Sequence, residues 1–211
     1  MSLLHAPMCV AGLRPSPVQA CAEAGVPYLS LFAFSTENWK RPEEEVSSLM
    51  GLFMSYLEKE VASMNDNGVR LRVLGDVGRF SAPLQNLIRQ AEAQTANNTR
   101  ITLLVCANYG GRWDMLSAAR AWQDAHPGQS LHDMTEEGLS PYLSTADAPE
   151  VDLLIRTGGE SRVSNFLLWQ AAYAELFFTD DLWPDFKPER LREAMTWFAK
   201  RDRRFGSSAP L

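Results

Sequence analysis

Short apolar runs alternate along the chain with longer segments in which apolar residues recur every three or four positions. The runs are rich in β-branched and aromatic residues and cover residues 28–34, 69–74, 101–107, 151–155 and 176–178. Runs of this length bounded by turn residues are typical of strands that are buried on both faces. The alternation therefore predicts an α/β fold, a single domain in which a mostly parallel sheet is flanked by helices.

The segment 46–64 carries the clearest helical pattern in the chain. Its apolar residues repeat at helical spacing after the acidic run 43–45, whose negative charge stabilises a helix N-terminus. Weaker patterns of the same kind predict helices around residues 84–91 and 113–119, after Thr135, and from Pro188 onward. Ser164 and Asn165 are candidate caps for another helix, which would carry the apolar side chains from Leu167 on.

Length and composition are those of an ordinary globular protein. The 211 residues suffice for one substantial core, and 45% hydrophobic against 22% charged residues is unlike a disordered chain. The net charge of -6 argues against nucleic acid as a partner, because such surfaces depend on many Lys and Arg contacts to phosphates. Cys9, Cys21 and Cys106 have no metal-ligand spacing and are interpreted as reduced thiols. The sequence has no apolar stretch of membrane-spanning length, so we expect a cytoplasmic protein.

Three polar clusters directly follow predicted strands. They occupy residues 34–41, 108–114 and 156–160 and are rich in Arg, Asn, Glu and Gly. The carboxyl ends of parallel strands meet at one edge of a sheet, and ligands bind at that edge in open α/β folds. We therefore expect the three clusters to converge on one site.

The segment that begins at Arg156 joins anion-binding residue types to large apolar side chains. Arg156 and Arg162 offer forked donors that match phosphate oxygens, and the intervening Gly158 and Gly159 let backbone amides approach a ligand closely. The apolar side chains that follow are Leu167, Leu168, Trp169 and Tyr173. This combination suits a ligand with a charged head and an apolar tail.

Each cluster also has a purely structural interpretation. Pairing of Arg156 with Glu160 in a surface turn would explain the third cluster, and a local pair of Arg112 with Asp114 beside a glycine turn would explain the second. A strand-to-helix turn explains most of the first cluster, although not the placement of Trp39 and Arg41. The three histidines are scattered, so a histidine metal site or a histidine-based catalytic triad has little support. Neither a Walker phosphate loop nor a GxGxxG motif is present.

Four motifs in this order and spacing resemble the cis-prenyltransferase family, and within it the bacterial undecaprenyl diphosphate synthases. They are Phe-Ser-Thr-Glu-Asn-Trp-Lys-Arg-Pro at 34–42, Asn-Tyr-Gly-Gly-Arg-Trp-Asp at 108–114, the long run 155–176, and Leu-Trp-Pro-Asp-Phe at 182–186. The resemblance covers residues 18–206, which we take as one domain. Residues 1–17 form a segment outside the family pattern, and residues 207–211 form a tail.

The resemblance implies an enzyme that uses Mg²⁺, acts as a homodimer, and condenses isopentenyl diphosphate with an allylic diphosphate such as farnesyl diphosphate. Residues matching those that bind isopentenyl diphosphate are Arg156, Arg162 and Ser164, with Val163 in the same substrate-binding set. Residues matching others that contact substrate are Ser35, Thr36, Glu37, Trp39 and Arg41. Glu175 matches a residue that helps to bind the metal, and Asn38 matches one proposed to assist proton removal. A lipid product also suggests peripheral contact with a membrane.

Chemistry agrees with most of these roles but modifies that of Asn38. Departure of a diphosphate leaves allylic cation character, so the rate depends on cationic groups and Mg²⁺ that neutralise the leaving group where water is excluded. A neutral amide has no useful basicity near pH 7. We therefore expect Asn38 to orient a proton acceptor, such as the diphosphate itself, rather than to act as the base.

The beginning of the chain departs from the family pattern. Family members open with a strand and an Asp-Gly-Asn-Gly-Arg-Trp motif whose Asp serves metal and diphosphate, whereas residues 1–17 contain neither this motif nor any Asp or Glu. We therefore expect the first strand of the sheet to be missing, with residues 8–10 filling a little of the gap. Ser161 also stands where some relatives carry a metal-associated His.

Two hypotheses of different classes follow. A cis-prenyltransferase is favoured by the retained residues for isopentenyl diphosphate and metal, with weak or no turnover expected of this chain. A non-catalytic protein of the same fold, which binds diphosphate or serves as a dimer partner, is favoured by the absence of the Asp-Gly motif.

Overall fold

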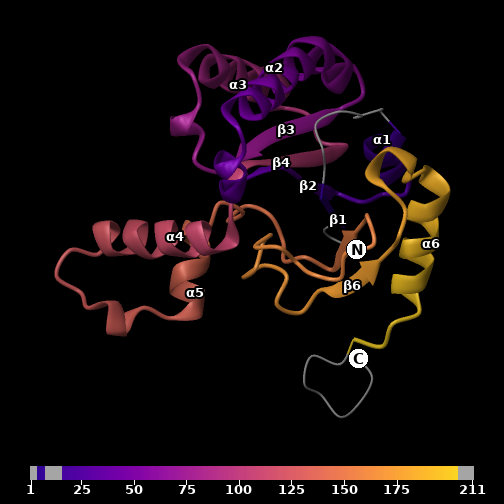
Figure 1. Ribbon diagram of the computed structural model, residues 1–211. Coiled ribbons are helices and arrows are strands. Elements are labelled where there is room, and N and C mark those ends of the chain that lie inside the picture. Colours follow the sequence, from indigo (N-terminus) through magenta and orange to yellow (C-terminus); the bar gives the residue numbers. More distant parts are fainter. Residues whose placement is uncertain (1–3, 8–15, 204–211) are drawn as a thin grey trace.

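The computed structural model describes residues 4–7 and 16–203, which fold around one parallel sheet (Figure 1). The strands are β1 (Leu4–Pro7), β2 (Tyr28–Ser35), β3 (Val69–Leu74), β4 (Ile101–Tyr109), β5 (Leu153–Arg156) and β6 (Glu175–Phe178). They lie in the order β3-β4-β2-β1-β5-β6, and all neighbouring pairs are parallel. The predicted α/β fold is confirmed, and all five predicted runs form strands.

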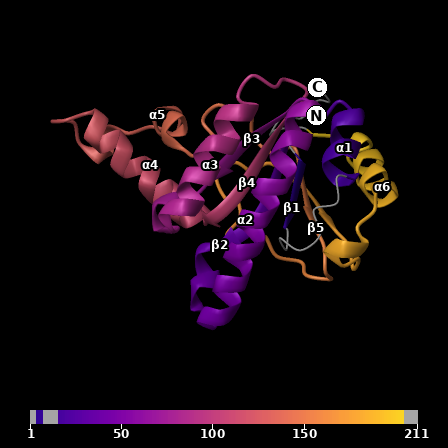
Figure 2. The same ribbon diagram turned by 90° about the horizontal axis from the view of Figure 1, so that it is seen from above.

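The predicted helices also form, except the one expected after Ser164 and Asn165, and one helix is added that the apolar pattern does not predict. The helices are α1 (Ser16–Glu23), which is the addition, α2 (Glu43–Asp66), α3 (Ala82–Thr95), α4 (Gly111–Ala125), α5 (Glu136–Leu139) and α6 (Pro188–Ala199). Short 3-10 turns are η1 (Thr36–Lys40), η2 (Val77–Arg79), η3 (Leu131–Asp133), η4 (Ser140–Tyr142) and η5 (Trp183–Asp185). In both ribbon views α4 and α5 form an arm that projects from the sheet (Figures 1 and 2).

Alternate residues of the central strands enter two different cores. Leu31 and Val105 belong to the first core, where α1, α2, α3 and α6 cover one face of the sheet. Phe32, Leu104 and Cys106 belong to the second core on the opposite face. Burial on both faces explains why β2 and β4 read as continuous apolar runs rather than as alternating ones.

The centre of the sheet is occupied, so our expectation of a missing first strand is wrong. β1 pairs with β2 from Leu4 opposite Leu29 to Pro7 opposite Phe32, and it pairs with β5 on its other side. A gap here would leave backbone N–H and C=O groups of β2 and β5 unpaired inside the protein. An extended segment that forms hydrogen bonds with both strands is therefore strongly favoured at this position. Residues 8–10, which we expected to fill part of the gap, lie outside the described residues.

No helix follows Ser164 and Asn165, so the prediction that they cap one in their own segment is wrong. The φ angles of Ser164, Asn165 and Leu167 are 53°, 62° and 40°, which lie in the left-handed region that a right-handed helix does not enter. Phe166 and Leu167 are buried in the second core, and Phe166 stacks on Phe32 with 4.3 Å between ring centroids. Consecutive apolar residues cannot all lie on one helix face, so the chain turns repeatedly to bury them.

A buried carboxylate ties this irregular segment to α4. Asp114, which is 2% exposed, accepts hydrogen bonds from Tyr109 Oη at 2.8 Å and from Gln170 Nε2 at 3.0 Å. Its other oxygen accepts from Ser144 N at 2.9 Å and from Ser144 Oγ at 2.7 Å. The alternative in which Asp114 forms a local pair with Arg112 is therefore wrong, and the carboxylate instead joins segments far apart in the sequence.

Replacing Asp114 by Ala should lower the free energy of unfolding by about 3 kcal/mol, because the donors of Tyr109, Ser144 and Gln170 would be buried without an acceptor. Urea denaturation measures the change. The matched control is Asp124→Ala at an exposed position of the same helix, where the change should stay below about 0.5 kcal/mol. Equal values for the two variants would show that the buried network contributes nothing to stability.

Candidate functional site

The carboxyl edge of the sheet carries a pocket where segments from three parts of the chain meet. Its volume is about 420 Å³, and its lining residues are Ser35, Glu37, Arg112, Ser164, Asn165 and Leu168. These residues come from the end of β2 and η1, from the start of α4, and from the irregular segment after β5. The first two predicted clusters thus meet here, together with residues that follow the third.

The turn η1 presents its side chains through hydrogen bonds of its own. Asn38 Oδ1 accepts from Ser35 N at 2.8 Å, and Glu37 accepts from Thr36 Oγ1 at 3.1 Å and from Asn165 Nδ2 at 2.8 Å. Burial alone would raise the pKa of Glu37, but hydrogen bonds from its own backbone, Asn165 and Thr36 outweigh burial and hold the pKa below its usual value. Glu37 is therefore ionised at neutral pH, and the carbonyl oxygen of Asn38 is already in use.

Asn165 is the residue of the site that sequence reasoning undervalued. It does cap a helix, but the helix is α4, because Asn165 Oδ1 accepts from Arg112 N at 3.0 Å and its backbone oxygen accepts from Gly111 N at 2.7 Å. Gly110 leaves the necessary room, since a Cβ there would lie 2.8 Å from Thr36 Oγ1 and 2.7 Å from Asn165 Nδ2. The sequence signal for this contact was the glycine pair at the start of α4. It marks a place where the segment containing Asn165 approaches the backbone closely, and not only a turn.

Trp39 is held by a structural partner. Its Nε1 donates to Asn108 Oδ1 at 2.7 Å, and the fully buried Asn108 in turn donates from Nδ2 to the backbone oxygen of Asp76 at 2.7 Å. The Arg79 guanidinium lies 4.8 Å from the centroid of the Trp39 ring. The cluster 108–114 therefore has a clear structural role, and it fixes the orientation of Trp39 beside η1.

Arg156 and Arg162 place two positive charges close together at the end of β5. Burial lowers the pKa of Arg156, and the neighbouring charge of Arg162 lowers it further. The buried Nε of Arg156 meets no hydrogen-bond acceptor in the described part of the chain. Glu160 forms its ion pair with Arg162, so the pairing of Glu160 with Arg156 that would have explained this cluster structurally is wrong. An anion is the missing partner that this arrangement favours.

The remaining predicted site residues are divided between this edge and other places. Val163 packs against the second core, while Ser164 is exposed and lines the pocket. Arg41 lies at the start of α2, with Nη1 3.9 Å from Glu45 Oε2, and does not line the pocket. The structure thus brings Ser35, Glu37 and Ser164 together in the pocket lining, which includes neither Arg41 nor the arginines Arg156 and Arg162.

Glu175 lies at the opposite end of the sheet from the two arginines. It begins β6 opposite Leu153, whereas Arg156 pairs with Phe178 at the other end of that strand. Its Oε2 accepts from Arg201 Nε at 3.1 Å. Within the residues that the structure describes, no group of three or more His, Cys, Asp or Glu side chains could hold a metal ion. The predicted role of Glu175 as a metal ligand therefore stays a prediction, and in the described structure its carboxylate pairs with Arg201.

Comparisons of the sequence identify relatives over most of the chain. A family described as putative undecaprenyl diphosphate synthase matches residues 14–206. An isoprenyl transferase of Ralstonia nicotianae is 54% identical over 192 residues, which are 91% of this chain and 74% of the relative. A Pseudomonas aeruginosa protein, named ditrans,polycis-undecaprenyl-diphosphate synthase ((2E,6E)-farnesyl-diphosphate specific), is 54% identical over 91% of this chain and 77% of its own length.

Solved structures of similar proteins share the fold. A probable undecaprenyl diphosphate synthase from Campylobacter jejuni superposes with a TM-score of 0.88 at 31% identity. Lavandulyl diphosphate synthase from Lavandula x intermedia, solved in complex with dimethylallyl diphosphate, superposes with a TM-score of 0.90 at 28% identity. Each match covers 97% of this chain and 98% of the solved chain. Among the described helices, none combines the length and the apolar character needed to cross a membrane.

The family match extends through both clusters that form the pocket, through Arg156 at the end of β5 and through Arg162 beyond it. Together with relatives more than half identical over 91% of its length, this match shows that the chain is an enzyme of the isoprenyl transferase class and belongs to the cis-prenyltransferase family.

Proposed function

We propose that the chain condenses isopentenyl diphosphate with an allylic diphosphate of the farnesyl type to give a polyprenyl diphosphate. In each cycle the allylic C–O bond breaks, a carbon–carbon bond forms to the terminal methylene carbon of isopentenyl diphosphate, and one proton leaves the isopentenyl unit. The diphosphate group of the allylic substrate departs as inorganic diphosphate. The observation that carries this proposal is the buried Nε of Arg156, which meets no hydrogen-bond acceptor within the described residues, in a segment where Arg162 is also exposed and paired with Glu160.

The chain's own residues have separate tasks in this reaction. Arg156 and Arg162 hold the diphosphate of the isopentenyl substrate, and Ser164 adds a hydroxyl at the pocket wall. Asn38 has its carbonyl oxygen occupied by Ser35 N at 2.8 Å, so it serves to orient the substrate and not to remove the proton. The departing diphosphate is the stronger proton acceptor within reach of the reaction.

Mg²⁺ is proposed as the counter-ion of the substrate diphosphate. When bound it supplies positive charge that stabilises the leaving group. In proteins Mg²⁺ is commonly held by one or two carboxylates together with substrate phosphates and waters, so no preformed cage of side chains is required. We also propose a cytoplasmic location with peripheral contact to a membrane, since the product would be a lipid.

A second candidate function is diphosphate binding without catalysis, because residues 1–17 contain no Asp or Glu. Purified chain incubated with farnesyl diphosphate, labelled isopentenyl diphosphate and Mg²⁺ should form labelled polyprenyl product, and EDTA should abolish the product. Binding of isopentenyl diphosphate without any turnover would instead favour the non-catalytic candidate.

Arg156→Ala and Arg162→Ala should each weaken isopentenyl diphosphate binding by about 1.5 to 3 kcal/mol, the range for hydrogen bonds to charged groups. Isothermal titration calorimetry measures the affinity. Arg192→Ala is the matched control, because this exposed arginine lies on α6, where its guanidinium forms an ion pair with Glu189 at 3.5 Å. Unchanged affinity in both site variants would show that the head group binds elsewhere.

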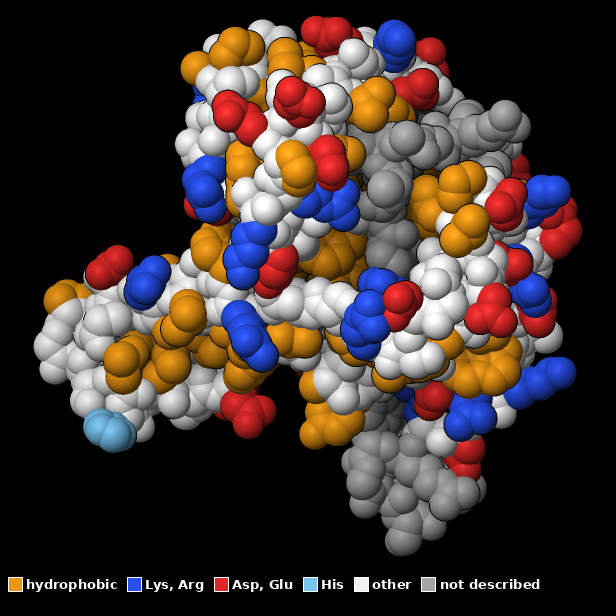
Figure 3. Space-filling view, in the orientation of Figure 1, with side chains coloured by type: hydrophobic (Ala, Val, Ile, Leu, Met, Phe, Trp, Pro, Cys, Tyr) orange, Lys and Arg blue, Asp and Glu red, His pale blue; other side chains and the backbone are white. Residues whose placement is uncertain are grey.

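We propose a homodimer that uses the α4–α5 arm. Leu116 on α4 is 58% exposed and Leu131 on the connecting loop is 52% exposed, and the space-filling view shows hydrophobic side chains gathered over the arm (Figure 3). A projecting arm with exposed large apolar residues is costly in water unless it packs on another surface. A second copy of the chain is the partner that the family relationship favours.

Leu116→Asp should weaken self-association roughly 30-fold or more, since loss of a central apolar contact costs about 2 kcal/mol or more. Analytical ultracentrifugation measures the dimerisation constant. Leu52→Asp, at a 46% exposed position of α2 outside the arm, is the matched control and should leave the dimer intact. A wild-type chain that stays monomeric at all concentrations contradicts the proposal.

A further inference from the structure

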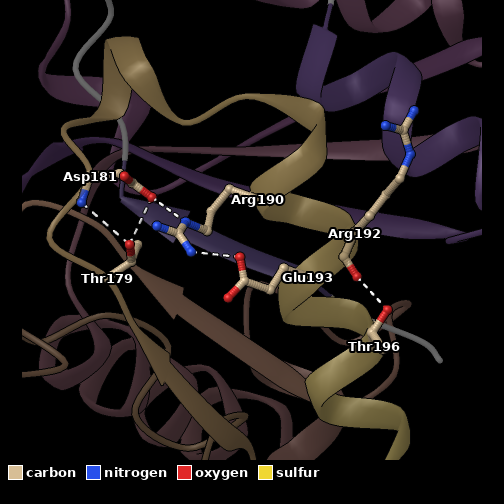
Figure 4. A network of polar contacts seen from close by, with 6 residues as sticks. All are labelled: Thr179, Asp181, Arg190, Arg192, Glu193 and Thr196. Atoms are coloured by element: carbon tan, nitrogen blue, oxygen red, sulfur yellow. Dashed lines mark hydrogen bonds and ion pairs between the residues drawn. The ribbon is translucent and has the colours of Figure 1, made fainter.

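A polar clasp connects α6 to the loop that follows β6 (Figure 4). Arg190 on α6 donates from Nε to Asp181 Oδ2 at 2.5 Å, and its Nη1 lies 2.5 Å from Glu193 Oε2. Thr179 Oγ1 donates to the same Asp181 oxygen at 2.8 Å and accepts from Asp181 N at 3.3 Å. The pKa of Asp181 is lowered, first by the hydrogen bond from Arg190 and then by that from Thr179. The conformation of residues 179–181 is therefore set by contacts that include a side chain from α6.

The loop that the clasp holds is bonded in turn to the glycine turn after β5. Thr179 N donates to Arg156 O at 2.9 Å, Gly159 N to Thr179 O at 3.1 Å, and Gly158 N to Asp181 O at 2.8 Å. Gly158 and Gly159 have φ of +85° and +72°, and both are exposed, so packing does not fix this turn. Its two amides are instead held by the backbone oxygens of the clasped loop.

We propose that Arg190 is a positioning residue for the diphosphate site, acting through Asp181 on the Gly158–Gly159 turn that lies between Arg156 and Arg162. Two successive glycines can adopt many backbone conformations when nothing restrains them. Because the clasp orders the turn before a ligand arrives, binding does not have to pay that entropic cost. α6 provides a firm base, because Leu191 and Ala194, which follow Arg190, are buried in the first core.

The ion pairs of Arg190 indicate a positioning role for this residue rather than direct binding of the ligand. Arg190 has carboxylates on two of its donor nitrogens, so its charge is already matched. Asp181 and Arg190 side chains are 29% and 38% exposed, and an ion pair of that kind adds little to global stability. The importance of the clasp therefore lies in the local order of the turn rather than in the free energy of unfolding.

The test compares Arg190→Met with Arg192→Met. Arg192 is on the same helix and pairs with Glu189 at 3.5 Å, and in Figure 4 it extends away from the clasp. Amide hydrogen exchange of the peptide containing Gly158 and Gly159 is measured in the ligand-free protein, and the Kd for isopentenyl diphosphate is measured by calorimetry. For Arg190→Met we expect faster exchange at the turn and a Kd roughly fivefold to tenfold higher, with both unchanged for Arg192→Met.

Two further variants separate positioning from general damage. Asp181→Asn should reproduce the effects of Arg190→Met, and the double variant should be no worse than either single variant, because both break the same link. Arg190→Lys keeps one donor for Asp181 and should restore part of the affinity. Exchange in β3 and β4 should stay at the wild-type rate in every variant, which shows that the fold is intact.

The inference rests on the proposed function for its ligand, but the exchange measurement needs no ligand. If the wild-type chain does not bind isopentenyl diphosphate, the proposed function fails while turn ordering by Arg190 is still decided by exchange. Unchanged exchange at Gly158 and Gly159 in Arg190→Met overturns the inference. So does an equal response to Arg192→Met, or faster exchange with no change in a measurable Kd.

Discussion

The structure depends on one constraint: a segment that is neither helix nor strand must cover one face of a buried parallel sheet. Backbone groups of this segment require partners that a helix would have supplied internally. Gly111 N donates to Asn165 O at 2.7 Å, and Val151 N donates to Gln170 O at 2.9 Å. Side chains of the segment also form hydrogen bonds with the rest of the protein: Asn165 caps α4, and Gln170 donates to the buried Asp114 at 3.0 Å. Because Ser164 lies in this segment, the bonds that seal the second core also shape the pocket.

Arg156 and Arg162 place positive charge at the carboxyl end of β5, with Glu160 paired to Arg162, although the chain is acidic overall, with a net charge of -6. Partial burial of Arg156 and the neighbouring charge of Arg162 both lower the pKa of Arg156. Arg156 still stays charged at neutral pH, because the usual pKa of an arginine is very high. The protein thus holds a charged group in an unfavourable position, and an anion that accepts from its Nε relieves this. Local placement of charge, rather than net charge, decides where an anion is favoured.

Periodic features of the fold were predictable, and features set by contacts between distant segments were not. The strands at 28–34, 69–74 and 101–107 follow from apolar runs, and convergence of two clusters at the carboxyl edge follows from parallel pairing. The irregular course after Ser164 was not predictable from cap residues, because burial of Phe166 against Phe32 outweighs the helical alternative. The central strand was missed because its position depends on unpaired backbone groups of its neighbours, which no local pattern records.

The strand register limits what Glu175 can do within one copy. Glu175 pairs with Leu153, and Phe178 pairs with Arg156, so three residues of extended chain, about 10 Å, separate their levels. A magnesium–oxygen bond is about 2.1 Å long, so one ion joins the Glu175 carboxylate to a phosphate held at Arg156 only where the two side chains and the phosphate together span this separation. Glu175 is also matched by Arg201 at 3.1 Å. A metal role for Glu175 therefore places two requirements on the site: the carboxylate gives up its pairing with Arg201, and the side chains bridge the separation between the two strand ends.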